Sequence, residues 1–288
     1  MFEQATLLQQ LGNPYTNRVV DRLHQFAYIP DVVIENLANE SLTEEWGNNN
    51  YVLKKYLAVH IPWSIEQGCY THSDNQFYVT AGNLQTRYGT PLYLAFQESN
   101  GDQPWRIVAS GANVRAVELP AAPDIPALPQ LVPGSEIVMR HDHILGDNAE
   151  RVPFLADTPP VAQMCAVAGA TQWSLNRDLK LPYWYYGKMN YVVPLYLADR
   201  ENIARAPDAI APIQVSPNNL LVRTVLAPHM PYASARVSVM RHDQLPPWLL
   251  DAWAEHSANV EEDDQRDEEA AGEQPDAVEA PQGEVANA

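Results

Sequence analysis

Prolines at Pro120, Pro123, Pro126 and Pro129, near the middle of the chain, limit most strongly what this sequence can fold into. Proline lacks a backbone N–H and its ring clashes with the preceding helical turn, so neither a helix nor a central strand can cross this stretch. The three-residue spacing matches the polyproline II repeat. We therefore expect a stiff extended strap, continuing to Pro133, that runs along the surface between two halves of a domain.

The half before the prolines begins with helical patterns and ends with strand patterns. Apolar residues recur near every 3.6 positions over residues 31–46 and 51–61, which predicts two amphipathic helices, the second bent or ended by Pro62. Lys54 and Lys55 fall on the polar face of the second helix. The segments that follow predict an antiparallel meander. Its strands are expected around residues 77–81, 91–97 and 105–110.

The half after the prolines mixes the same two patterns. A helix is expected over residues 161–179, and a short final helix over residues 248–256. Between them, strands are expected at residues 209–215, 220–227 and 235–240. The expected fold class is therefore α+β, a single domain over residues 1–254 with an antiparallel sheet core flanked by helices. Its 46% of hydrophobic residues is enough to form a sizeable core.

The end of the chain differs in composition from the rest. Residues 255–288 contain twelve acidic residues and one arginine, so −11 of the net charge of −18 lies there. A segment this poor in large apolar residues cannot offset the entropy of ordering, which predicts a disordered acidic tail. Such a tail keeps a protein soluble or binds a basic partner.

Cysteine usage and hydropathy indicate where such a chain works. Cys69 and Cys165 form no CxxC pair and suggest no disulfide framework, which fits a reducing compartment. No window approaches 18 uninterrupted apolar residues. We expect a cytoplasmic protein without a membrane partner.

The segment VMRHDHILGDN, residues 138–148, is the densest in titratable groups. If residues 137–143 form a strand, His141 and His143 lie on one face, a spacing that suits zinc or iron. Such a site needs at least one more ligand, and the candidates are Asp147, Asp142 and His242. With Asp147 the set gives a divalent metal site and a metal-dependent hydrolase as one hypothesis. The alternative is that both histidines bond backbone groups and the GDN sequence forms a turn.

The stretch LPYWYYGKMNYVVPLYL, residues 181–197, interleaves aromatic side chains with a lysine. Aromatic and basic residues together can form a stacking platform for single-stranded nucleic acid. The alternative is ordinary packing on a sheet face. The binding residues expected on the first interpretation are Tyr183, Tyr185, Lys188, Tyr232 and Arg236.

Several segments in preserved order, between about residues 20 and 250, carry a resemblance to a known family. They are FAYIP and LANESLTEEW within residues 26–46, YVLKKYL at 51–57, LYLAFQESN and PWRI within 92–107, DHILGDNAERVPF at 142–154, LPYWYY at 181–186, VVPLYL at 192–197 and RTVLAPHMPYASARV at 223–237. Together they resemble the domain of unknown function 3825 family. Two short positions depart from its pattern, AGNLQT at residues 81–86 and the pair Ala233 and Ser234.

The resemblance implies no particular activity, because that family has none assigned. Its members sometimes share a chain with small modules thought to bind RNA, so the resemblance implies a connection with RNA metabolism. The main hypothesis is a non-catalytic binding or regulatory domain whose partner is RNA or an RNA-binding protein. The alternatives are the metal-dependent hydrolase built on His141, His143 and Asp147, and a scaffold that binds a protein partner through the proline strap or the acidic tail.

Overall fold

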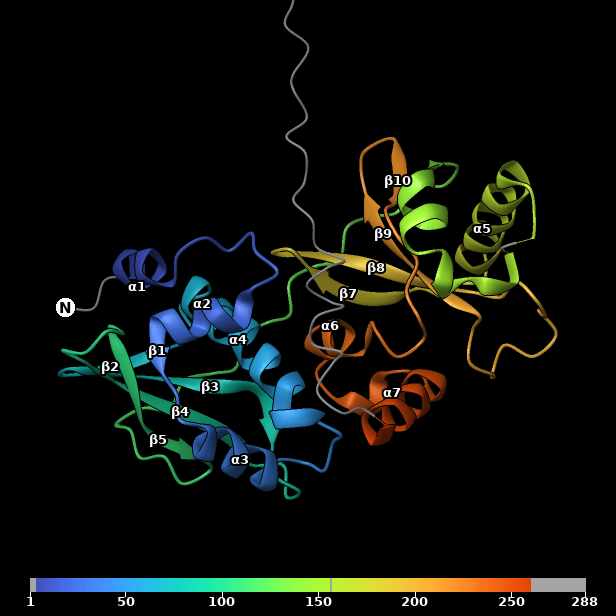
Figure 1. The fold of residues 1–288 in the computed structure, drawn as a ribbon. Helices are drawn as coiled ribbons and strands as arrows, with labels where there is room; N and C mark the ends of the chain where they lie inside the picture. Colours follow the sequence, from blue (N-terminus) through green and yellow to red (C-terminus); the bar gives the residue numbers. More distant parts are fainter. Residues whose placement is uncertain (1–3, 156, 260–288) are drawn as a thin grey trace, which may run out of the picture.

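The computed structural model describes residues 4–155 and 157–259, and shows an α+β fold with two five-stranded sheets (Figure 1). The first sheet has the order β1-β5-β4-β3-β2, antiparallel except for the parallel pair β1 and β5. Its strands are β1 (Ala27–Tyr28), β2 (Thr71–Ser73), β3 (Gln76–Gln85), β4 (Pro91–Glu98) and β5 (Trp105–Gly111). The predicted meander is its centre. The short strands β1 and β2 form its edges.

Helix α4 (Tyr51–Glu66) lies between the first sheet and the C-terminal half (Figure 1). It is apolar on all sides and almost wholly buried, and it packs against β3. The sequence predicted Lys55 on a solvated polar face of this helix, but Lys55 is buried. A helix that is covered on most sides has no broad solvated face. Pro62 does not end the helix either, because burial of the turn after it offsets the missing backbone hydrogen bond. Other helices cover the same layer: α1 (Gln4–Leu11), α2 (Val19–Phe26) and α3 (Asp31–Glu40).

The second sheet follows the prolines and has the order β6-β10-β9-β8-β7. Only β6 and β10 pair in parallel. Helix α5 (Pro160–Leu175) packs on β8 and covers the outer side of this sheet in Figure 1. The strands are β6 (Glu136–Met139), β7 (Leu181–Tyr185), β8 (Lys188–Leu195), β9 (Ala209–Val215) and β10 (Asn219–Val222).

Helix α6 (Tyr232–Val237) joins the two halves, because it packs on α4 and on β7. The expected strand over residues 235–240 is therefore wrong. All six residues of α6 are buried between two layers, and buried contacts on every side suit a helical turn better than a sheet edge. The largest apolar core consequently includes residues of both sheets, such as Phe96 and Trp184. Helix α7 (Pro247–Asn259) follows and packs on α6.

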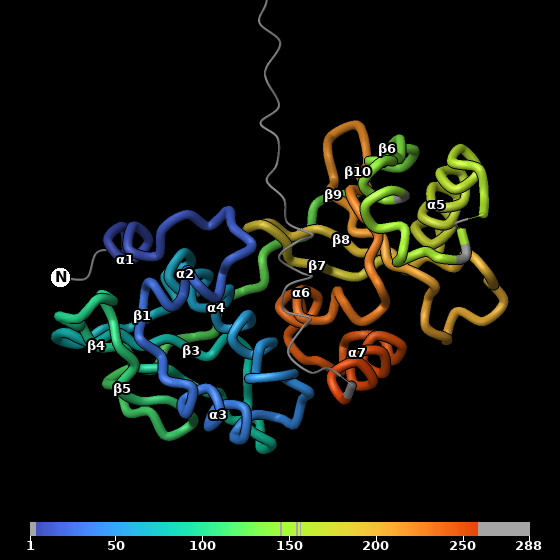
Figure 2. The backbone as a smooth tube through the Cα atoms, viewed as in Figure 1, coloured from blue at the N-terminus to red at the C-terminus, as the bar shows by residue number. Residues whose placement is uncertain are grey.

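The segment of residues 112–135 crosses between the sheets without helix or strand, and the tube in Figure 2 follows it from β5 to β6. Gln67 holds its first part: the Gln67 amide donates to the Asp124 carbonyl and accepts from the Asp124 N–H, both at 2.8 Å. Tyr191 on β8 donates its hydroxyl to the Pro129 carbonyl at 2.9 Å. The strap is thus fastened to both halves of the protein.

Helix boundaries differ from the sequence predictions at three places. Helix α3 ends at Glu40 and α5 ends at Leu175, each several residues earlier than expected. Helix α7 continues to Asn259, which places residues 255–259 of the predicted tail in a helix. The remainder of that tail, residues 260–288, lies outside the described residues. No helix in the described part of the chain is long and apolar enough to cross a membrane.

Candidate binding cleft and buried polar centre

A cleft of about 530 Å³ opens between the two halves of the protein. One wall comes from the N-terminal half, through α2, α3, the 3₁₀ turn Asn48–Asn50 and the start of α4. The opposite wall is the edge strand β7 with Tyr186 after it, and the segment from Leu226 to Ser234 completes the lining. The cleft therefore exists only because α4, α6 and β7 pack together.

The β7 wall of the cleft is aromatic. Tyr183, Trp184, Tyr185 and Tyr186 all contribute to the lining. The rings of Tyr183 and Tyr185 stack with centroids 6.2 Å apart and an interplanar angle of 19°, as expected for alternate residues on one strand face. Tyr183 is buried and Tyr185 is half-buried, so Tyr185 presents more of its ring to the cleft.

The opposite wall is charged. Arg18, Lys54 and Lys55 line it together with Asp21, Asp31 and Glu35. Lys54 binds Asp31 at 2.8 Å, and this hydrogen bond and charge lower the pKa of the Asp31 carboxyl. The Lys55 ammonium lies 5.8 Å from the ring centre of Tyr51. A ligand in the cleft therefore meets aromatic rings on one side and, on the other, basic side chains interleaved with carboxylates, one of which is already paired with Lys54.

Of the predicted binding residues, the structure places Tyr183 and Tyr185 in the cleft. Lys188 is exposed beyond it, at the tip of the β7–β8 hairpin, with its ammonium 5.7 Å from the ring centre of Tyr15. Gly187 beside it has φ +75°, and a Cβ there would lie 2.8 Å from the Pro14 carbonyl oxygen, so the hairpin tip is closely packed.

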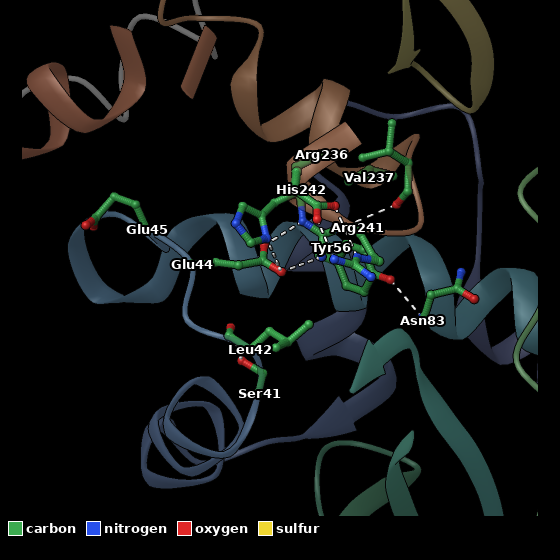
Figure 3. Close-up of polar contacts among 12 residues, drawn as sticks. Ser41, Leu42, Glu44, Glu45, Tyr56, Asn83, Arg236, Val237, Arg241 and His242 are labelled. Carbon is green, nitrogen blue, oxygen red and sulfur yellow. Dashed lines mark hydrogen bonds and ion pairs between the residues drawn. The ribbon is translucent and has the colours of Figure 1, made fainter. Parts of the chain in front are cut away.

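Arg236 lies instead in a buried polar centre shown in Figure 3. Tyr232, on the same helix, is buried too. Glu44, in the loop after α3, accepts hydrogen bonds from Arg236 Nε at 2.6 Å and Nη2 at 2.8 Å. Arg236 Nη1 donates to the Val239 carbonyl. Burial alone would lower the pKa of Arg236, but the hydrogen bonds to Glu44 raise it, so the pair stays charged. The Arg236 side chain is 1% exposed, and it is not available to a ligand at the surface.

Aromatic rings surround this ion pair. The Arg236 guanidinium lies 4.7 Å from the ring centre of Tyr56 and 5.8 Å from that of Trp46. Tyr56 also accepts a hydrogen bond from the backbone N–H of Asn83 at 2.8 Å, and burial raises the pKa of its hydroxyl. Burial also raises the pKa of Tyr232. The centre fastens the loop after α3 to α4 and α6.

His60 completes the buried centre on the α4 side. Its ring stacks on Tyr56 with centroids 4.0 Å apart, and its Nε2 lies 3.0 Å from the Val237 carbonyl oxygen. Because that oxygen can only accept, Nε2 carries the proton and Nδ1 is bare in the neutral ring. Burial lowers the pKa of His60 to about 3, so the ring is neutral at physiological pH.

The segment that carries His141 and His143 does not have the expected strand geometry. Strand β6 ends at Met139, and residues 141–147 form helical turns that place Ile144 in the second core. Residues two apart on a helix point in different directions, so the two histidines do not share a face. His141 Nδ1 lies 3.1 Å from Asp142 Oδ1, whereas His143 Nδ1 lies 3.1 Å from Asp147 Oδ2. Among residues 4–155 and 157–259, no three His, Cys, Asp or Glu side chains gather into a group that could hold a metal.

The sequence patterns did not reveal the buried positions of Glu44, His60 and Lys55. Glu44 is one of two adjacent glutamates before Trp46, and nothing in that pattern distinguishes a buried carboxylate from an exposed one. The apolar sequence of α4 is the feature that indicates a buried His60, because the residues around His60 in this helix are apolar on every side. A lysine or histidine in such a helix must find a partner inside the protein.

The two sheets, the helices between them and the aromatic cleft define an α+β domain with a cleft between its halves. The chain belongs to the DUF3825 family, a domain of unknown function, whose model matches residues 37–245. The matched part includes Glu44, α4, β7 and Arg236. No curated protein and no solved structure matches the chain.

Proposed function

We propose that this protein is a non-catalytic domain that binds single-stranded RNA in the cleft between its two sheets. The observation that carries the proposal is the juxtaposition of stacked Tyr183 and Tyr185 with Lys54 and Lys55 across one cleft. Aromatic rings accept unstacked bases, and lysines neutralise backbone phosphates, which together give binding without base-specific readout. The aromatic residues also have the open-edged strand β7 as a rigid support.

The test is fluorescence anisotropy with a labelled oligouridylate and the full chain. A base stacked on an aromatic side chain contributes about 1–3 kcal/mol, so Tyr185→Ala should weaken binding by roughly 5- to 150-fold. Tyr185 is chosen over Tyr183 because it is only half-buried, and its removal disturbs the core less. The matched control is Tyr88→Ala, whose ring is 78% exposed on the first half, and which should bind as the wild type does.

Two results would contradict this function. One is a wild-type chain that does not bind oligouridylate at low salt. The other is equal weakening by Tyr185→Ala and Tyr88→Ala, which would place the RNA outside the cleft.

The strap supports a second candidate function, recognition of a protein partner. Several of its large apolar side chains are exposed although hydrogen bonds fasten the strap at Asp124 and Pro129. They are Val117, Leu119, Leu128 and Val132. Replacing Leu128 and Val132 with serine and comparing the proteins that co-purify with each form from the native host tests this role. An unchanged set of partners counts against it.

We place either function in the cytoplasm. Cys69 and Cys165 are free thiols, which suits a reducing compartment. Fractionation of cells that express the full chain, followed by immunodetection, is the direct check.

A further inference from the structure

Two arginines meet on one indole ring at the C-terminal end of α5. The Arg177 guanidinium carbon lies 4.0 Å from the ring centre of Trp173, and that of Arg200 lies 5.3 Å from the same centre. Trp173 belongs to α5, Arg177 follows that helix, and Arg200 lies in the loop after β8. Two separate segments, the end of α5 and the loop after β8, therefore bring two positive charges to one place.

Backbone hydrogen bonds fix both arginines. Arg177 Nη1 donates to the Trp173 carbonyl at 3.3 Å, and Arg200 Nε donates to the Tyr196 carbonyl at 2.9 Å. Contact with the indole further restricts both guanidinium groups, and the hydrogen bonds to the backbone leave other N–H groups of each guanidinium available to an anion. The entropy cost of binding an anion is thereby reduced, since the donors are already held in place.

Neither arginine has a carboxylate within 4.0 Å among the residues that the structure describes. The acids around them have other partners: Asp178 pairs with Lys180, and Asp208 pairs with Arg205. Asp199 accepts the backbone N–H of Glu201. Both arginines are exposed, so their charges face solvent and are open to an external anion.

Arg177 lies close in sequence to the strand that carries the tyrosines of the cleft. Lys180 immediately precedes β7, Arg177 lies three residues before Lys180, and Tyr183 and Tyr185 line the cleft from β7. The five residue steps from Lys180 to Tyr185 span about 17 Å of extended chain. A single strand of nucleic acid that leaves the cleft past the N-terminal end of β7 would reach Arg177 and Arg200.

We propose that Arg177 and Arg200, held on Trp173, bind backbone phosphates of the RNA strand whose bases occupy the cleft. Two exposed ion pairs are weak by themselves, so the site adds to a ligand that is anchored elsewhere. The guanidinium edge matches the geometry of a phosphate group, and no base contact is needed. This inference rests on the proposed function, because it requires a strand anchored between β7 and α4.

The experiment compares a tetranucleotide and a pentadecanucleotide of uridine, with the full chain, over a salt titration. For a single strand, each phosphate contact makes the slope of log affinity against log salt steeper by about 0.7. The double variant Arg177→Gln and Arg200→Gln should therefore make this slope shallower by about 1.4 for the long oligonucleotide. It should also weaken the binding of that oligonucleotide roughly ten-fold or more. Binding of the short oligonucleotide should not change, because it fills only the cleft.

The matched control is the double variant Arg87→Gln and Arg106→Gln. It removes the same charge from exposed arginines of the first half, one of them stacked on Tyr88 at 4.8 Å. It should leave the slope for the long oligonucleotide unchanged. The melting temperature of each variant shows whether it is folded.

Three outcomes separate the two proposals. If the wild type binds both oligonucleotides and the two double variants behave alike, the phosphate site is overturned and the cleft function stands. The second outcome uses an acidic peptide with the sequence of residues 261–269 as competitor of the long oligonucleotide. If the peptide competes in the wild type but not in the Arg177 and Arg200 variant, and if that variant still binds RNA normally, the site binds carboxylates. The inference then fails. If the wild type binds neither oligonucleotide, both proposals fall.

Discussion

The carboxylate of Glu44 and the guanidinium of Arg236 form a two-bonded ion pair across 192 residues of sequence, in a site that excludes solvent from both partners. Glu44 belongs to the loop after α3, and Arg236 belongs to α6. The pair therefore holds the N-terminal half against the helix that packs on the second sheet. Its energetic consequence depends on whether one partner or both are removed.

Removal of one partner should strongly destabilise the fold. Arg236→Met leaves the Glu44 carboxylate buried without its counter-ion, which costs about 3–5 kcal/mol. Arg241→Met is the matched control, because Arg241 pairs with Asp243 at the surface and such pairs contribute about 1 kcal/mol or less. Chemical denaturation of the three proteins measures both effects. Equal destabilisation by the two variants would show that the buried pair does not fasten the two halves.

Removal of both partners should restore much of the stability. The double variant Glu44→Leu and Arg236→Met replaces a buried ion pair by apolar side chains of comparable length, a change that is often neutral. We expect its free energy of unfolding to lie above that of Arg236→Met by about 2 kcal/mol or more. A double variant less stable than Arg236→Met would indicate that the aromatic rings around the pair require the guanidinium.

Stability should fall in mild acid because of His60. The folded pKa of about 3 lies below the unfolded value near 6.5, so the unfolded chain takes up a proton first as the pH falls. The contribution of neutral His60 is complete above pH 6.5, and it is lost as the pH decreases toward 3. At pH 5 the loss amounts to about 2 kcal/mol relative to pH 7.

The measurement for His60 is the free energy of unfolding between pH 7 and pH 5. His60→Gln keeps a side-chain N–H for the Val237 carbonyl but cannot titrate, so its stability should depend less on pH by that amount. His24→Gln, at an exposed position, should keep the wild-type dependence. An unchanged slope in His60→Gln would contradict the assigned protonation state.

Gly82 should not tolerate alanine. Its φ is +59°, and a Cβ would lie 2.7 Å from the Tyr56 hydroxyl oxygen and 2.8 Å from the His60 ring, both fixed in the buried centre. Gly12 has φ +72° with no atom within 4 Å of the same position, so Gly12→Ala reports backbone strain alone. Thermal unfolding should show Gly82→Ala less stable than Gly12→Ala by about 1–3 kcal/mol. Equal losses would mean that the Tyr56 ring can move.

Gln67 should control how tightly the strap is held. Gln67→Ala removes two hydrogen bonds to the backbone of Asp124, worth about 0.5–1.5 kcal/mol each. Amide exchange at residue 124 should rise, whereas exchange in β4 should not change. Exchange that stays slow at residue 124 would show that the other contacts, such as those of Thr71 with Glu118 and of Tyr191 with Pro129, are enough to fix the strap.

The sequence predicted elements whose periodicity reflects a single buried face. Strands β3 to β5 and β9 alternate or run apolar between turn residues, and they were expected close to their true positions. The strand predicted over residues 235–240 overlaps helix α6. The helix sequence YASARV is only six residues long, too short to show either the helical or the strand periodicity of apolar residues. The fold class, α+β, did not depend on that one element.

The candidate site was predicted only in part. Tyr183 and Tyr185 were predicted because their aromatic side chains cluster in sequence, and they do line the cleft. Arg236 was expected beside them, but its partner Glu44 lies 192 residues away, and no local pattern reveals such a pair. The helical turn at His141 and His143 depends on burial of Ile144 against α5 and the second sheet, which is likewise a tertiary effect.

The position of α6 sets an order of events during synthesis. Ribosomes deliver the N-terminal half first, so sheet one and α4 are complete while the codons for α6 are still untranslated. Until Arg236 emerges, the carboxylate of Glu44 has no counter-ion, and the surface of α4 that α6 will cover remains open to water. The nascent N-terminal half therefore lacks the contacts that α6 provides, and the cleft between the sheets forms only after the last fifth of the chain has been synthesised.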